Sequence, residues 1–194
     1  MFLLRKPTDE LVRQLLADQR DLPFTYPAVG ATRTGVIPGL PVNHHRARLG
    51  EGEGTFARAV AALHGWAMYR LSWTRLCWPD APLEPGAAVA VVVRHLGLWS
   101  VNPCRIVYLL EERGAIERAG FAIGTLPEHA ERGEERFSVE WHRSDDSVWF
   151  ELFACAGPNH WLTRVGYPGL RLLQHRFGKG AIRAMRSAVH SPPA

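Results

Sequence analysis

EERFSVEWHRSDDSVWFELFACA, residues 134–156, contains two alternating runs of apolar and polar residues joined by a short polar segment. In the first run Phe137, Val139 and Trp141 alternate with polar residues, and in the second run Phe150 and Leu152 stand on either side of Glu151. Side chains of a strand point alternately to its two faces, so this pattern is typical of strands with one buried face. The intervening SDD is typical of a turn. The stretch therefore predicts an antiparallel hairpin.

Four further strand-like runs precede this hairpin at close spacing. They are rich in β-branched and aromatic residues, and glycine or proline separates them. The runs are LSWTRLCW (71–78), AAVAVVVRHL (87–96), CRIVYLLEE (104–112) and RAGFAIGTL (118–126), with stops at Pro79, Gly114 and Pro127. Six successive strands with short connections favour a meandering antiparallel sheet. Another candidate strand, Val42–Leu49, lies upstream.

Three other segments have the periodicity of amphipathic helices. Residues 8–20 follow a start signal at Pro7 and Thr8, and a second helix is expected from an N-cap at Thr55. After a break at Gly166 and Pro168, the pattern predicts a long helix over about residues 168–189 with an apolar inner stripe. Its outer stripe is basic and contains Arg171, His175, Lys179, Arg183 and Arg186.

This order of elements predicts one α+β domain over residues 1–194. Residues 1–41 would form an N-terminal helix and an irregular loop, and residues 42–194 the core. A curved antiparallel sheet must cover one apolar face, and the long C-terminal helix is the natural cover. If the sheet curls around the helix, a cavity remains between them.

Composition narrows the class of protein. The chain has 46% hydrophobic and 22% charged residues, and no apolar run approaches the roughly 18 residues that span a bilayer. The start, MFLLRKPTDE, does not resemble a secretory signal. Cys77, Cys104 and Cys155 form no CxxC pair, so we expect reduced thiols, a cytoplasmic location and no metal. The net charge of +4 is modest, and the basic stripe lacks interleaved aromatics, so we do not expect a nucleic-acid partner.

Four long motifs carry a family resemblance: VNHHRARLGEGEGTF (42–56), VRHLGLWSVNPCRIVYLLEE (93–112), GFAIGTLPEHAERGEERFSVEW (120–141) and PGLRLLQHRFGKGAIRAM (168–185). They resemble the domain-of-unknown-function family DUF1990 over nearly the whole chain. The element order is also similar to the START-like helix-grip fold, in which a curved sheet wraps a C-terminal helix around an apolar cavity. That similarity implies binding of lipids, polyketides or other apolar molecules, some of which such proteins cyclise or hydrolyse.

RHLGLWSVNPCRIVYL, residues 94–109, contains the three residue types of a thiol-protease site, His95, Asn102 and Cys104. Asn102–Pro103 indicates a turn, in which the asparagine side chain bonds its own backbone. Cys104 opens an apolar strand, so it lacks the helix N-terminus that commonly supplies the oxyanion hole beside the cysteine of a thiol protease. A buried, inert thiol is therefore the favoured interpretation.

The apolar segment LGLWSVNP within that stretch either plugs the end of the sheet or forms a lip over a cavity. Thr125 and His129 lie at the end of a strand and could make polar contacts to a ligand. The residues that we expect to contact a ligand are Leu98, Trp99, Asn102, Tyr108, Thr125, Phe153 and Phe177.

GTLPEHAERGEERF, residues 124–137, gathers Glu128, His129, Glu131, Glu134 and Glu135. No metal-ligand motif is present, and the interleaved arginines favour a solvated, salt-bridged loop. A catalytic acid–base pair of His129 and Glu134 stays open as an alternative.

The sequence therefore favours binding of a small apolar or amphipathic molecule between sheet and helix, without a cofactor. One alternative is a cofactor-independent cyclase, isomerase or hydrolase that uses His95, His129 or Glu134. Another is an interaction or membrane-surface protein that uses the basic C-terminal helix. The identity of the ligand and the oligomeric state stay open.

Overall fold

The computed structural model describes residues 1–78, 82–95 and 97–191. Its strands are β1 (Phe2–Leu3), β2 (Val42–Glu51), β3 (Thr74–Cys77), β4 (Ala88–His95), β5 (Leu98–Glu112), β6 (Ile116–Thr125), β7 (Glu131–His142) and β8 (Ser147–Pro158). Its helices are α1 (Asp9–Gln19), α2 (Glu53–His64), α3 (Trp161–Val165) and α4 (Tyr167–His190), with short 3-10 turns η1 (Ala31–Arg33) and η2 (Ala67–Tyr69).

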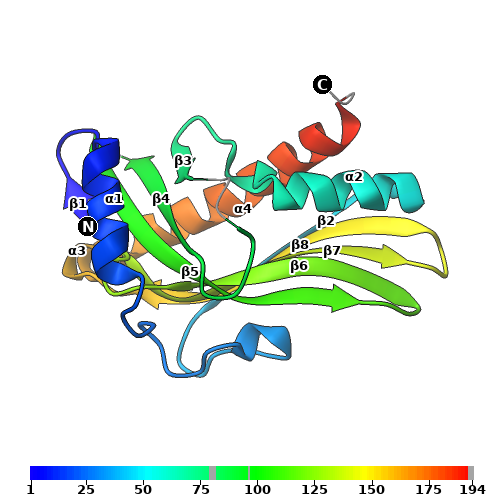
Figure 1. Cartoon of the computed structure of the whole chain (residues 1–194), viewed down its shortest axis with the longest axis horizontal. Helices are drawn as coiled ribbons and strands as arrows, with labels where there is room; N and C mark the ends of the chain where they lie inside the picture. Colours follow the sequence, from blue (N-terminus) through cyan, green and yellow to red (C-terminus); the bar gives the residue numbers. More distant parts are fainter. Residues whose placement is uncertain (79–81, 96, 192–194) are drawn as a thin grey trace.

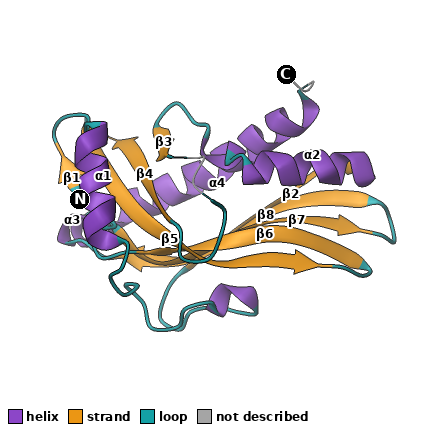
Figure 2. Ribbon diagram, viewed as in Figure 1, coloured by secondary structure: helices purple, strands orange, loops and turns teal. Residues whose placement is uncertain are grey.

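One antiparallel sheet organises the chain, with the strand order β2-β8-β7-β6-β5-β4-β3 and β1 paired to β5. The sheet is strongly curved, and α4 crosses its inner face beside α2 (Figure 1). Helix α1 packs on β4 and β5 (Figure 2). The α+β fold with a curved sheet around a long C-terminal helix, expected from the sequence, is confirmed.

The alternation in residues 134–156 determines which side chains enter the core. Phe137 pairs with Leu152, and Val139 pairs with Phe150, in the register of β7 and β8. These four side chains are buried in the cluster between the sheet, α2 and α4. Burial of a large apolar side chain contributes about 1.5–3 kcal/mol, so the inner face of this hairpin stabilises the curved sheet.

The predicted turn at Asn102–Pro103 is wrong. Strand β5 begins at Leu98, and Asn102 pairs with Val91 of β4 inside the sheet. Pro103 lies opposite Leu126, just after β6 ends, and its carbonyl accepts the Leu126 amide at 3.1 Å. Proline is tolerated there because the Leu126 carbonyl accepts the His129 amide at 2.9 Å and so does not need the missing N–H of Pro103.

Two other boundaries differ from the sequence prediction. Helix α2 begins at Glu53 rather than at Thr55, because Gly52 adopts a φ of +83° and its carbonyl accepts the Thr55 amide at 3.1 Å. The strand expected over 71–78 is limited to Thr74–Cys77, and the stop expected at Pro79 lies outside the described residues.

Candidate functional site

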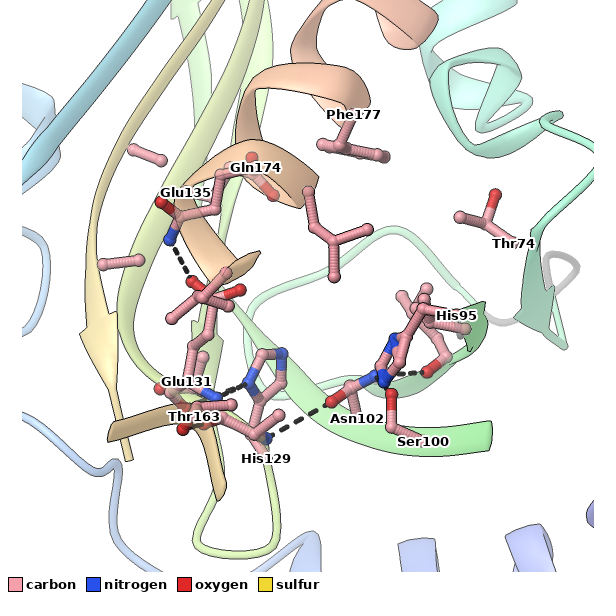
Figure 3. A pocket seen from close by; sticks show the side chains of 18 of the residues that line it. Thr74, His95, Ser100, Asn102, His129, Glu131, Glu135, Thr163, Gln174 and Phe177 are labelled. Carbon is pink, nitrogen blue, oxygen red and sulfur yellow. Dashed lines mark hydrogen bonds between the residues drawn. The ribbon is translucent and has the colours of Figure 1, made fainter. Parts of the chain in front are cut away.

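A cavity of about 420 Å³ lies between α4 and the inner face of the sheet. Its apolar lining comes from alternate residues of four strands and from α3 and α4 (Figure 3). These residues include Val91, Val93, Leu98, Ile123, Leu152, Ala154, Ala156, Leu162, Leu170, Leu173 and Phe177. At about 30 Å³ for each water molecule, the volume corresponds to about 14 waters, so it can hold a small organic molecule.

Two carboxyl groups of β7 face this cavity. Glu131 and Glu135 lie four residues apart on the inner face, with Gly133 between them. Gly133 has a φ of +143°, and a β-carbon there would lie 2.0 Å from the Cys155 carbonyl oxygen. Only glycine fits this position, so the wall between the two carboxyl groups carries no side chain.

Few hydrogen bonds satisfy these carboxyl groups. The Gln174 side-chain amide donates to Glu131 (Figure 3), and Arg171 Nη1 donates to Gln174 Oε1 at 2.9 Å. Glu135 accepts one long bond, from the Tyr69 hydroxyl at 3.4 Å. Arg171, assigned above to the solvated stripe, thus orients the amide that binds Glu131.

The scarcity of partners affects the protonation of both groups. Burial raises the pKa of Glu135 to about 8, and the nearby Glu131 charge adds to this effect. Burial also raises the pKa of Glu131 to about 7, against the opposing effects of Gln174 and Arg171. At neutral pH the cavity can therefore hold these groups as acids that donate protons or hydrogen bonds.

His129 presents an imidazole beside the two carboxyl groups. Its Nδ1 lies 2.8 Å from the Glu131 amide nitrogen and 3.0 Å from the Glu131 carbonyl oxygen, so Nδ1 has a backbone partner in either tautomer. Burial lowers the pKa of His129 to about 3, helped by the N-terminal amine. The imidazole is therefore neutral, and Nε2 has no hydrogen-bond partner among the described residues.

Asn102 and Thr125 line the cavity but are largely engaged within the protein. Asn102 Nδ2 donates to the Val91 carbonyl at 3.2 Å, and its Oδ1 accepts the Ala130 amide at 3.2 Å. Thr125 Oγ1 accepts the Gly133 amide at 2.8 Å and also bonds the Thr25 hydroxyl. These bonds link strands and loops, so both side chains shape the wall of the cavity.

Cys104 lines the cavity without an activating partner. Its thiol is buried, and burial raises its pKa well above the usual range. Within the described residues, no hydrogen bond joins it to a histidine, and the one partner of its sulfur is the Asn102 carbonyl at 3.9 Å. His95 lies in the same lining, with an Nδ1 that is buried and unpartnered, and burial lowers its pKa.

Of the expected ligand contacts, Leu98, Asn102, Thr125 and Phe177 line the cavity, whereas three aromatic residues lie outside it. Trp99 alternates with Leu98 and packs with the α1 cluster. A bulge between Ile106 and Tyr108 turns the Tyr108 side chain outward, where its hydroxyl bonds the Thr32 hydroxyl at 2.9 Å. Phe153 packs against the loop of residues 21–41.

Glu134 also points away from the cavity. Its carboxylate accepts the Tyr26 hydroxyl at 2.7 Å and the Gly30 and Thr32 amides at 2.7 and 3.0 Å. The acid–base pair of His129 and Glu134 considered above is therefore not formed, because the Glu134 side chain lies on the outer face of β7 whereas His129, in the turn before β7, lines the cavity. Glu134 instead fastens the loop of residues 21–41 to the sheet.

The sequence prediction missed Glu131, Glu135, Gln174 and Tyr69 as cavity residues. The segment expected as a solvated loop is the start of β7, so Glu131 and Glu135 continue the inward alternation of Phe137 and Val139. Counting that alternation backward would have placed both carboxyl groups inside.

The described residues contain no group of three histidine, cysteine or acidic side chains that could hold a metal ion. Among the helices described, none combines the length and apolarity required to cross a membrane. The polar side chains that face the cavity carry two carboxyl groups, imidazoles, amides and hydroxyls.

The curved sheet, the C-terminal helix and the cavity between them define a helix-grip protein. Residues 25–184 match the family described as domain of unknown function DUF1990, and the chain belongs to this family. A UPF0548 protein of Dictyostelium discoideum is 32% identical over 98% of this chain and 97% of its own. A UPF0548 protein of Deinococcus radiodurans is 36% identical over 96% and 94%. Human STARD10 has a TM-score of 0.46 and 13% identity, covering 95% of this chain and 80% of its own.

Proposed function

We propose that the protein binds a small amphipathic molecule in the cavity between the sheet and α4. The observation that carries this proposal is a cavity of about 420 Å³ with an apolar wall and a polar group of Glu131, Glu135 and His129. Pockets of about 300–1,000 Å³ with a few convergent polar groups are the usual form of small-molecule sites.

The two parts of the cavity suggest how such a molecule would lie. Its apolar body would contact Leu152, Leu173 and Phe177, and its polar group would face Glu131 and Glu135. Unfilled apolar surface of this kind is water-exposed in the empty protein, and its burial favours binding by about 25 cal/mol for each Å². The basic outer stripe of α4 is not required for this function.

Fluorescence titration with 1-naphthylmethanol tests the proposal, because this neutral alcohol has an apolar ring and one polar group. We expect saturable binding at one site per chain. Ala156→Phe, which places a ring in the cavity from β8, should weaken binding at least tenfold. Ala57→Phe, on the exposed side of α2, is the matched control and should bind normally.

Failure of the alcohol to bind would contradict the proposal. Equal binding by wild type and by a folded Ala156→Phe variant would also contradict it, because the alcohol would then occupy another surface. Circular dichroism of each variant establishes that the sheet and helices are retained.

A further inference from the structure

We propose that the cavity selects an organic cation, an ammonium group on an apolar body, and that Glu131 and Glu135 bind the ammonium. This inference rests on the proposed function and adds the chemical class of the ligand. The proposal follows from which charged and aromatic side chains line the cavity and from their hydrogen bonds.

Among the described residues that line the cavity there is no lysine or arginine. The ionisable lining side chains that point inward are Glu131, Glu135, His95, His129, Tyr69 and Cys104. Arg171 approaches from α4, but it reaches Glu131 through Gln174 rather than directly. The cavity therefore contains two potential negative charges and no lining side chain that is permanently positive.

Glu135 has the greater need of a partner. A carboxylate can accept about four hydrogen bonds, and Glu135 has a single long one from Tyr69. Its other neighbours are Glu131, which repels its charge, and Cys104, which is a weak donor. An ammonium group would supply up to three donors and a positive charge at this place.

His129 gives a second, independent indication that a ligand belongs here. Its side chain is partly buried and lines the cavity, and its Nδ1 is engaged by the Glu131 backbone. Figure 3 shows the ring beside Glu131 at the cavity. Nε2 has no hydrogen-bond partner among the described residues, so a polar atom or π-face of a ligand can bond it there.

The apolar wall beside Glu135 suits a cation as well. Tyr69 contacts Glu135 and packs on Phe177 with ring centroids 5.2 Å apart, and Trp73 packs on the same ring at 6.4 Å. Aromatic faces attract ammonium groups, and more strongly where water is excluded. Acidic and aromatic residues thus meet at one end of the cavity.

Ammonium binding would ionise the acids. The ligand enters as the protonated amine, Glu135 releases its proton to solvent, and the carboxylate then pairs with the ammonium. Because burial keeps Glu135 protonated up to a pKa of about 8, affinity should rise with pH between about 6 and 8. Glu131, whose pKa burial raises to about 7, ionises over the same range and adds to the rise in affinity. Tyr69 stays neutral, because burial raises its pKa well above the usual range.

Three ligands that share the 1-naphthylmethyl group and differ in charge test the inference by isothermal titration calorimetry at pH 7.5. They are 1-naphthylmethylamine, which is protonated like lysine at this pH, neutral 1-naphthylmethanol and anionic 1-naphthylacetate. A charge-assisted hydrogen bond contributes about 1.5–3 kcal/mol, so the amine should bind about tenfold to a hundredfold more tightly than the alcohol. The acetate should bind most weakly.

Glu131→Gln, Glu135→Gln and the double glutamine variant should remove most of the preference for the amine, measured as the ratio of the amine and alcohol affinities within each variant. Glu10→Gln, an exposed substitution on α1, is the matched control and should keep the wild-type ratio. Circular dichroism of each variant establishes that the sheet and helices are retained.

Equal binding of amine and alcohol, or the tightest binding by the acetate, would overturn the inference and leave the proposed function in place. A preference for the amine that survives in the double glutamine variant would overturn the role of the two carboxyl groups. If none of the three ligands binds wild type, the proposed function itself fails.

Discussion

Replacing Glu135 with glutamine tests whether this carboxyl group lies in a poorly solvated cavity. In the unfolded chain the group ionises near its ordinary pKa of 4.5, whereas burial raises the pKa to about 8 in the folded protein. Between these values the folded state binds more protons than the unfolded state, so stability falls as the pH rises. Glutamine resembles the protonated acid and cannot ionise, so the variant should lose less stability over this range.

The expected magnitude follows from the raised pKa. A tenfold change in proton affinity corresponds to about 1.4 kcal/mol, so the full change from 4.5 to about 8 sets an upper value of about 5 kcal/mol. Relaxation and water inside the cavity reduce this value, and we expect about 2–3 kcal/mol in favour of Glu135→Gln at pH 8. At pH 4.5 the folded carboxyl group is protonated and the unfolded one is only half ionised, so the two proteins should be nearly equal.

Urea unfolding of wild type and Glu135→Gln between pH 4.5 and 9 measures this difference, with Glu10→Gln as the exposed control. The difference in unfolding free energy should grow from pH 4.5 to about 8 and then level off. Parallel stability profiles over the whole range would refute the reasoning, because the carboxyl group would then be as well solvated in the folded protein as in the unfolded chain.

Three further predictions follow from the packing. Glu134→Gln should lower the unfolding free energy by about 2–4 kcal/mol and make residues 21–41 sensitive to limited proteolysis, because the carboxylate holds that loop; an unchanged cleavage pattern would contradict this. Gly178→Ala should destabilise by about 1–3 kcal/mol in thermal unfolding, since its β-carbon would lie 2.3 Å from the His45 ring. Gly169→Ala, with no atom within 4 Å, should be neutral or stabilising, and an equal loss in both variants would count against this packing. Cys104 should resist iodoacetamide at pH 8 in the folded protein, and rapid alkylation monitored by mass spectrometry would contradict its burial.

Much of the fold could be predicted because its strands have one buried face. Phe137, Val139, Phe150 and Leu152 follow a simple alternation, and the pairing of β7 with β8 matches it. The long amphipathic pattern before Val189 likewise predicts α4. These are local signals, and hydrophobic burial makes them reliable.

The content of the cavity was harder to predict, because it depends on exact strand phase. A single bulge turns Tyr108 outward, and the early start of β7 turns Glu131 and Glu135 inward. Both effects are set by the pairing of a strand with its neighbour in the sheet. The residues of one strand alone therefore do not reveal them. For the same reason, charged residues near the prolines and glycines of a turn are expected to be solvent-exposed when the sequence alone is considered.

Intermolecular nuclear Overhauser effects between 1-naphthylmethanol and methyl-labelled protein test the central claim most directly. If the molecule binds between the sheet and α4, its ring protons should show contacts to methyl groups of Val91, Ile123, Leu152 and Leu173. Contacts confined to methyl groups of the α1 side of the sheet, such as Val92 and Val101, would contradict the claim.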